Sequence, residues 1–126
     1  MPMGLFTLAE ARMELAGLRP VLDELVAVRA DAAELATGLA AGHQSTRLGG
    51  LPEWKAAEAR LDELMTEVQQ TGAELKGLAP LLVDFPADLH GVPVLLCWLE
   101  GEADLVWYHL ADVGFAGRRR LPDARS

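Results

Sequence analysis

The apolar residues of this chain change their spacing near Gly77, and this change constrains the fold more than any other feature. Before Gly77, leucine, valine and alanine recur three or four residues apart over two long stretches, which is the spacing of one face of an α-helix. After it, apolar residues gather in short runs bounded by glycine, proline and acidic residues, which is typical of antiparallel strands. The order of the two patterns predicts an α+β fold, with helices first and a sheet second.

The first helix is predicted to begin at Thr7, because Glu10 follows three residues later and completes a capping box. The apolar stripe that follows consists of Leu8, Ala11, Leu15, Leu18, Leu22, Leu25, Ala32, Ala36 and Leu39. Pro20 lies inside this stripe, and its missing N–H group predicts either a kink or the meeting of two helices.

A second helical stripe follows a connection of about eleven residues from Ala41 to Leu51, which contains glycine and shows no periodicity. It begins with Pro52 in the first turn and is predicted to end at Lys76 and Gly77, since lysine followed by glycine is a common helix end. Two stripes of similar length joined in this way predict a long antiparallel helical hairpin with coiled-coil-like packing.

The last part of the chain contains three apolar runs, Leu81 to Phe85, Val92 to Leu99 and Leu105 to Leu110. Their tight connections predict a three-stranded antiparallel β-meander. Side chains alternate between the two faces of a strand, and the middle run is apolar on both. A second subunit is expected to cover the remaining face, so the chain is predicted to form a homo-oligomer, a dimer first.

One domain over residues 1–126 is expected, with the helical hairpin at 7–77 and the sheet and tail at 78–126. The chain has 19 acidic and 11 basic residues and a net charge of -8, which argues against binding to nucleic acid or to anionic membranes.

The beginning of the chain, Met1 to Thr7, lacks a basic stretch followed by an apolar segment, and Val92 to Leu99 is too short to span a bilayer. A cytoplasmic protein is therefore expected. The single cysteine, Cys97, excludes an intrachain disulfide and a four-cysteine zinc site. We expect its thiol to be buried and inert, because no histidine lies near it in the sequence.

The C-terminal third carries a distinctive series of short motifs. They are Val83 to Pro86, Leu96 to Trp98, Gly101 with Glu102, Trp107 to His109, and Asp112 with Gly114 to Arg119. In these motifs the chain resembles DUF2203, a family of uncharacterised conserved bacterial proteins, and Phe6 to Ala11 with Leu18 to Pro20 is similar to the opening of that family. The resemblance spans nearly the whole chain, and because the family has no established activity it implies no mechanism.

Four side chains are candidate metal ligands. In a meander the end of the first strand, the start of the second and the end of the third lie at one edge, so Asp84, His90, His109 and Asp112 are predicted to converge. Two histidines and two carboxylates suit a divalent ion such as zinc, manganese or iron(II). This cluster favours a small metal-binding protein or a metal-dependent enzyme.

The charge pattern supports a different interpretation of the same acids. Residues 81–117 contain six acidic residues and no lysine or arginine, and three arginines follow at once. An arginine fork satisfies a carboxylate with two hydrogen bonds, so Arg118 or Arg119 is predicted to clamp Asp84 or Asp112. Binding of an anion by these arginines is the alternative.

The clamp interpretation is preferred, because paired charges without another partner are ordinarily architectural. The chain is accordingly predicted to be a non-enzymatic interaction or assembly module, oligomeric and with a protein partner, for which no cofactor is expected. The metal-dependent function is the alternative.

Overall fold

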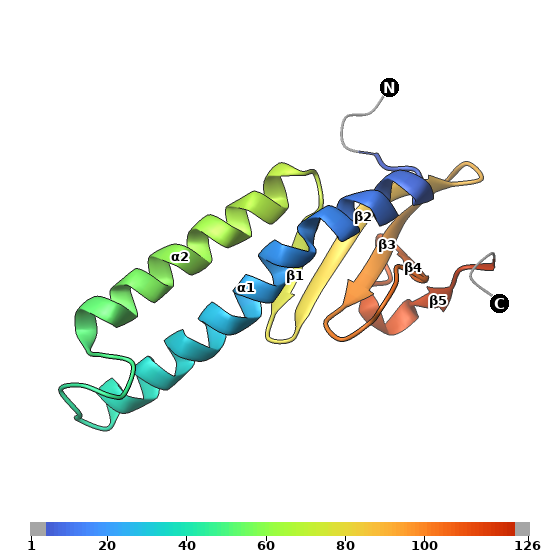
Figure 1. The fold of residues 1–126 in the computed structure, drawn as a ribbon. Helices are drawn as coiled ribbons and strands as arrows, with labels where there is room; N and C mark the ends of the chain where they lie inside the picture. Colours follow the sequence, from blue (N-terminus) through green and yellow to red (C-terminus); the bar gives the residue numbers. More distant parts are fainter. Residues whose placement is uncertain (1–4, 123–126) are drawn as a thin grey trace. The chain divides into compact units, whose positions relative to one another are not determined.

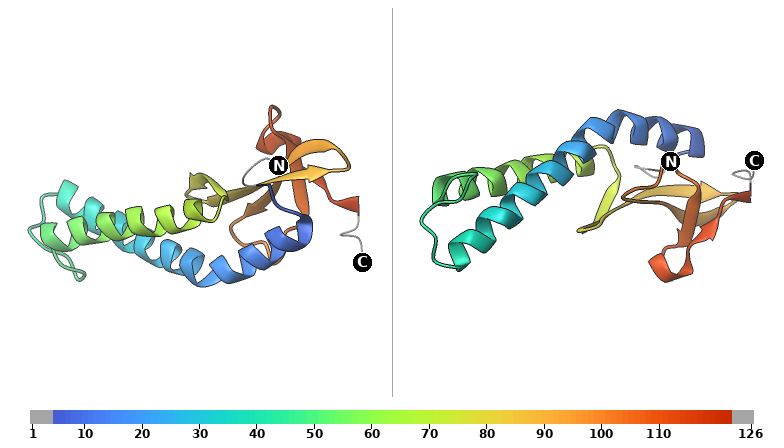
Figure 2. Two further views of the ribbon diagram at one scale, coloured as in Figure 1. Left: turned by 90° about the horizontal axis from the view of Figure 1, so that it is seen from above. Right: turned by 60° about the horizontal axis from the view of Figure 1, so that its bottom comes forward.

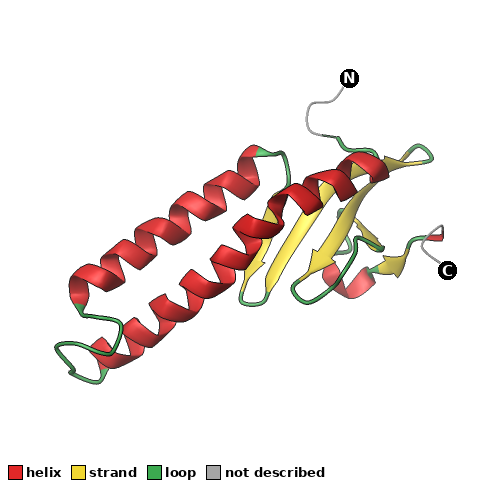
Figure 3. Ribbon diagram, in the orientation of Figure 1, coloured by secondary structure: helices red, strands yellow, loops and turns green. Residues whose placement is uncertain are grey.

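The computed structural model describes residues 5–122, which form two helices followed by a sheet (Figures 1 and 3). The elements are α1 (Leu8–Ala40), α2 (Leu51–Gln70), β1 (Glu74–Leu78), β2 (Leu81–Leu89), β3 (Val92–Leu99), β4 (Trp107–Leu110), the 3-10 turn η1 (Phe115–Gly117) and β5 (Arg119–Arg120). The predicted α+β class is confirmed. Within residues 5–122, neither helix is long and apolar enough to cross a membrane.

The chain divides into two compact units. The hairpin unit comprises Arg19–Glu67, and the sheet unit combines residues 5–18 with residues 68–122. The long helix α1 contributes its first turns to the sheet unit and the rest to the hairpin unit. The sheet unit is therefore built from two separate stretches of sequence.

In the hairpin unit, the second part of α1 runs antiparallel to α2 (Figure 1). Their buried apolar side chains are Leu22, Leu25, Ala32, Leu35, Leu61 and Leu64. A charge pair also joins the two helices, since Nε of Arg60 donates to Oε2 of Glu24 at 2.7 Å. Two helices joined by a loop were predicted correctly, while the coiled-coil packing stays a prediction.

The start of α1 has the predicted capping box. The backbone N–H of Thr7 donates to Oε1 of Glu10 at 2.9 Å, and the N–H of Glu10 donates to Oγ1 of Thr7 at 3.0 Å. Two N–H groups of the first turn thus find acceptors that the helix itself cannot offer. α1 then continues through Pro20 as one element, so the alternative of two helices meeting there is wrong.

The sheet has five antiparallel strands in the order β1-β2-β3-β4-β5, so the prediction of three strands was wrong. The predicted second helix runs too far, because α2 ends at Gln70 and Gly72 follows with a φ of 96°. Glycine favours this left-handed conformation after a helix, and the chain then enters β1. Leu75 keeps the helical spacing although it lies on a strand, which is why Lys76 and Gly77 resembled a helix end.

Strand β2 continues past Pro86, where the sequence predicted its end. The pairing of β1 with β2 reaches only as far as Asp84. Beyond that point β2 keeps its neighbour β3, and the carbonyl of Pro86 accepts a hydrogen bond of 2.7 Å from the N–H of Phe6. A proline has no backbone N–H to donate, and it is tolerated there because β1 no longer pairs with β2 on the side that faces Phe6.

The first turns of α1 lie over one face of the sheet (Figure 2). Phe6 meets Phe85 edge to face, with ring centroids 5.4 Å apart, and Nε of Arg12 donates to the carbonyl of Leu105 at 3.2 Å. The residues of this covered face are buried, among them Val83, Phe85, Leu96 and Trp98. Because strand side chains alternate, Asp84 and Cys97 point to the opposite face.

Candidate functional site

The strand register places three chemically active side chains on the face opposite α1. Asp84 pairs directly with Cys97, and Cys97 pairs with Trp107, two residues before His109. Residues that pair across antiparallel strands point to the same face, as do residues two apart on one strand. Asp84, Cys97 and His109 are exposed by only 1, 0 and 3%. One ligand atom from each lies within 4.8 Å of the others, and we call these three residues the buried cluster.

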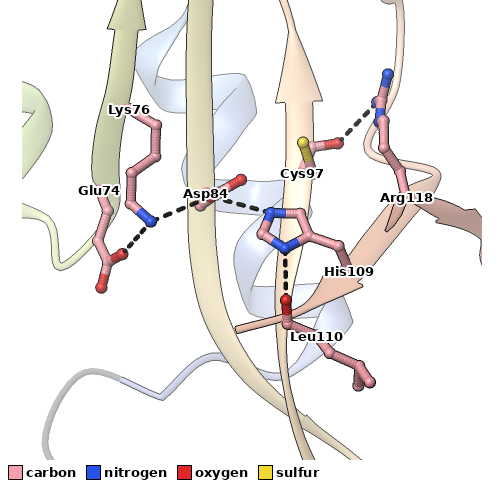
Figure 4. Close-up of polar contacts among 7 residues, drawn as sticks. All are labelled: Glu74, Lys76, Asp84, Cys97, His109, Leu110 and Arg118. Atoms are coloured by element: carbon pink, nitrogen blue, oxygen red, sulfur yellow. Dashed lines mark hydrogen bonds and ion pairs between the residues drawn. The ribbon is translucent and has the colours of Figure 1, made fainter. Parts of the chain in front are cut away.

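The ring of His109 is held from both sides (Figure 4). Nδ1 lies 2.9 Å from the backbone carbonyl of Leu110, and Nε2 lies 3.2 Å from Oδ2 of Asp84. A carbonyl only accepts hydrogen bonds, so Nδ1 carries the hydrogen and donates it. An ionised carboxylate also only accepts, and a proton or a metal cation must therefore lie between Nε2 and Oδ2 for this contact to be favourable.

Lys76 connects the buried cluster with the exposed edge of the sheet. Its Nζ lies 3.5 Å from Oδ2 of Asp84 and 3.1 Å from Oε1 of Glu74, and its side chain is 41% exposed. Burial lowers the pKa of Lys76, but the hydrogen bond to Glu74 and the charge of Asp84 outweigh it, so the pKa lies above its ordinary value. A positive charge therefore stands beside the buried carboxylate.

Cys97 is not placed to act as a nucleophile. Burial and the nearby charge of Asp84 raise the pKa of its thiol to about 12, so the sulfur keeps its proton at neutral pH. Activation would need a histidine nitrogen as base. Both nitrogens of His109 are engaged, one with Leu110 and one with Asp84. The geometry therefore argues against thiol catalysis, whereas a bound metal removes a thiol proton without a base.

Arg118 forms a clamp beside the cluster. Its Nη2 donates to Oε1 and Oε2 of Glu102 at 2.8 and 2.9 Å and to the backbone carbonyl of Cys97 at 3.3 Å. The guanidinium also lies over the rings of Trp107 and Phe115, at 4.7 and 4.8 Å from their centroids. Arg118 thus connects the segment after β4 to the backbone of Cys97 on β3.

The clamp has a different carboxylate from the predicted ones. The sequence suggested Asp84 or Asp112, whereas Arg118 pairs with Glu102. Arg119 is exposed, and its backbone pairs with Tyr108 in the sheet. The turn that contains Glu102 returns toward β3, where the N–H of Leu99 donates to Oε1 of Glu102 at 2.7 Å. That local hydrogen bond positions Glu102 for the arginine.

The structure brings together two of the four predicted metal ligands, Asp84 and His109. His90 is exposed, with a φ of 53°, in the two-residue turn between β2 and β3. It lies six residues beyond Asp84, which is about 20 Å along a strand. Asp112 is exposed in the turn after β4. The prediction assumed that residues near one edge of the sheet lie close together, whereas His90 and Asp112 lie in exposed turns outside the strands.

Cys97 joins the buried cluster although sequence reasoning set it aside. A signal for it exists, because His90 and Gly91 form a two-residue connection between Leu89 and the apolar run that begins at Val92, as in a tight hairpin. Counting back from such a turn pairs Leu89 with Val92 and hence Asp84 with Cys97, which is the observed register.

These features define an α+β protein with a helical hairpin, a five-stranded antiparallel sheet and a buried Asp–Cys–His cluster. The chain belongs to DUF2203, a family described as an uncharacterized conserved protein, whose family model matches residues 4–121. No curated protein and no solved structure matches the chain significantly. The three cluster residues all lie within the stretch that the family model matches.

Proposed function

We propose that this chain binds a divalent transition metal through the carboxylate of Asp84, the thiolate of Cys97 and Nε2 of His109. The observation that carries the proposal is the convergence of one ligand atom from each residue within 4.8 Å, at a place where all three side chains are buried. Carboxylate, thiolate and imidazole are the ligand types of protein zinc sites, and the same set accepts other first-row metals.

The orientation of His109 supports this proposal. Metal-bound histidines usually donate their second ring N–H to a carbonyl or a carboxylate, which fixes the ring and its tautomer. Nδ1 of His109 makes such a bond to Leu110, and this directs the lone pair of Nε2 toward Asp84. In addition, Oδ1 of Asp84 is buried and has no hydrogen-bond donor among the described residues. Buried carboxylate oxygens normally have a partner, and a metal ion supplies one.

The distances fit a tetrahedral ion after a small adjustment. Zinc bonds of about 2.0 to 2.3 Å imply ligand atoms roughly 3.3 to 3.8 Å apart. Nε2 of His109 and Oδ2 of Asp84 are 3.2 Å apart, and the widest separation in the cluster is within 4.8 Å. A contraction of at most about 1 Å between the ligand atoms would therefore bring the cluster to the spacing of a tetrahedral site. Binding would also release the thiol proton, which makes the affinity rise with pH.

Metal titration of the full chain tests this function. After treatment with a chelator, we expect the protein to bind one equivalent of Zn²⁺ or Co²⁺, with a thiolate-to-cobalt absorption band. Asp84→Asn, Cys97→Ser and His109→Gln should each weaken binding more than about 100-fold, since each removes a direct ligand.

Two matched controls separate this site from the sequence-based one. His90→Gln and Asp112→Asn change residues of the same types in exposed turns, and we expect both variants to bind the metal like the unchanged protein. The proposal would be contradicted if the unchanged protein did not bind the metal. It would also be contradicted if the Cys97→Ser variant and the His109→Gln variant both bound the metal with full affinity.

A second proposed function is that of an oligomeric interaction or assembly module, a homodimer first. It is supported by three large apolar side chains exposed near the end of the sheet, Leu110, Val113 and Phe115, at 42, 53 and 42%. Apolar groups that gather on a surface commonly mark contact sites. Sedimentation equilibrium at micromolar concentration should show a dimer that Val113→Asp dissociates, and a monomer throughout would remove this proposal.

A further inference from the structure

A four-coordinate metal held by the three residues of the buried cluster would have one coordination position left for another ligand. Among residues 5–122, Asp84, Cys97 and His109 are the one group of three or more histidines, cysteines and acids whose ligand atoms converge. A zinc-type ion takes four ligands, and sites with three protein ligands keep the fourth position for water or an added molecule. The chemistry around that position decides what it accepts.

Lys76 provides that chemistry. Its ammonium lies 3.5 Å from Oδ2 of Asp84, whereas about two-fifths of its side chain reaches solvent. A protonated lysine has three hydrogen-bond donors and no lone pair, so it does not ligate a metal. Its positive charge instead lies beside the carboxylate of Asp84, where it favours the approach of an anion.

Metal binding changes the partners of Lys76. In the structure, the ammonium contacts two carboxylates, those of Glu74 and Asp84. A metal held by the carboxylate of Asp84 would draw electron density from its oxygens and weaken the contact with Lys76. Lys76 would keep its contact with Glu74, and an anion bound to the metal would offer the ammonium a second acceptor.

We propose that the fourth position of the metal binds a small anion, held between the metal and the ammonium of Lys76. This inference rests on the proposed metal-binding function. The ligand class is a monoanion or oxyanion of a few atoms, such as hydroxide, a carboxylate or phosphate, because the ligand must reach a cluster that is at least 97% buried. Exchangeable ligands of this kind distinguish a reactive metal site from a purely structural one.

Cobalt spectroscopy on the full chain tests the anion position, with azide as the probe. We expect azide to change the visible bands of the Co²⁺-loaded protein in a saturable way. Lys76→Met should weaken azide binding about tenfold or more, and Lys76→Arg should restore most of the affinity because it keeps the charge. Acetate and phosphate, added in competition with azide, then show which oxyanion the position prefers.

The sequence offers one matched control, because the chain has only one other lysine, Lys55, which is exposed on α2. Lys55→Met removes the same charge from the protein, and we expect it to leave azide binding unchanged. An equal loss in Lys55→Met and Lys76→Met would overturn the proposal, since the effect would then come from net charge alone.

The outcomes separate this inference from the proposed function. If Co²⁺ binds and azide leaves its spectrum unchanged, the anion position is wrong while the metal site stands. If azide binds equally well to Lys76→Met, the role of Lys76 is wrong. If Co²⁺ does not bind to the unchanged protein, both the metal site and the anion position fail together.

Discussion

The hairpin unit and the sheet unit each contain a close contact between a basic and an acidic side chain, but the two contacts have different surroundings. In the hairpin unit, Arg60 lies 2.7 Å from Glu24, and their side chains are 41 and 43% exposed. In the sheet unit, Nε2 of His109 lies 3.2 Å from Oδ2 of Asp84, and the two side chains are only 3 and 2% exposed. The shorter contact is expected to matter less, because water screens exposed charges and burial strengthens both their attraction and the penalty for losing a partner.

Removing the buried carboxylate should have the largest effect. In metal-free protein, Asp84→Ala leaves Nε2 of His109 without its partner and Lys76 with Glu74 alone, and we expect the free energy of unfolding to fall by about 3 to 5 kcal/mol. Glu24→Ala makes the same change in the hairpin unit and should lower it far less. Urea unfolding of the two variants measures both losses, and equal losses would show that burial does not distinguish the units.

The arginine clamp comes next. Arg118→Ala removes the hydrogen bonds to Glu102 and Cys97 and the stacking on Trp107, so we expect a loss of about 2 to 3 kcal/mol. Arg118→Lys keeps the charge without the planar fork and should recover only part of this. Arg60→Ala is the matched change on the exposed pair, and thermal melting should rank it well below Arg118→Ala. The reverse ranking would contradict the comparison.

High pH should weaken the sheet unit through Cys97. The folded chain holds this thiol's pKa near 12, so above about pH 9 the native state keeps a proton that the unfolded chain has lost. Stability therefore falls as pH rises, by at most about 1.4 kcal/mol per pH unit from this group. Lys76 acts in the same direction, because its raised pKa favours folding until that pKa is passed.

Chemical unfolding of metal-free protein between pH 8 and 11 measures this slope. Cys97→Ala removes the thiol and should flatten the curve, leaving the part that comes from Lys76. A slope that is identical in the two proteins would show that the thiol has the same pKa in the folded and unfolded chains.

The smallest effect is expected in the hairpin unit at low pH. The hydrogen bond from Arg60 lowers the pKa of Glu24 below its ordinary value, in spite of some desolvation. The stability from this pair is present above the ordinary carboxyl pKa and is lost as pH falls through the lowered one. The difference between the unchanged protein and Glu24→Gln should therefore shrink below about pH 4, and it should also shrink in high salt. A difference that persists under both conditions would mean that the pair is not electrostatic in origin.

Local rules predicted the elements whose signals are local. The capping box at Thr7 and Glu10 and the strand from Val92 to Leu99 match the structure, because each depends on residues close together in sequence. β1 and β5 could not be found in this way. Leu75 continues a helical spacing by coincidence, and two arginines form a strand only because Trp107 and Tyr108 present an open edge to them.

The candidate site follows the same division. Asp84 and His109 were found because the order of three strands brings them to one region of the sheet. Cys97 and the partner of Arg118 depend on register, and a shift of one residue moves a side chain to the other face. The turn at His90 and Gly91 contains the register information, but only the paired strands show that the cluster lies well inside the sheet.

The discontinuous sheet unit has a consequence for synthesis on the ribosome. Phe6 and the first turns of α1 are made first, yet their partners on β2 and β3 leave the ribosome only after the whole hairpin unit has been made. Until then, Ala11, Leu15 and Leu18 have no sheet to cover. The hairpin unit, whose contacts are closer in sequence, can fold during this interval, and the nascent N-terminal segment is the part of the chain that would need protection from aggregation.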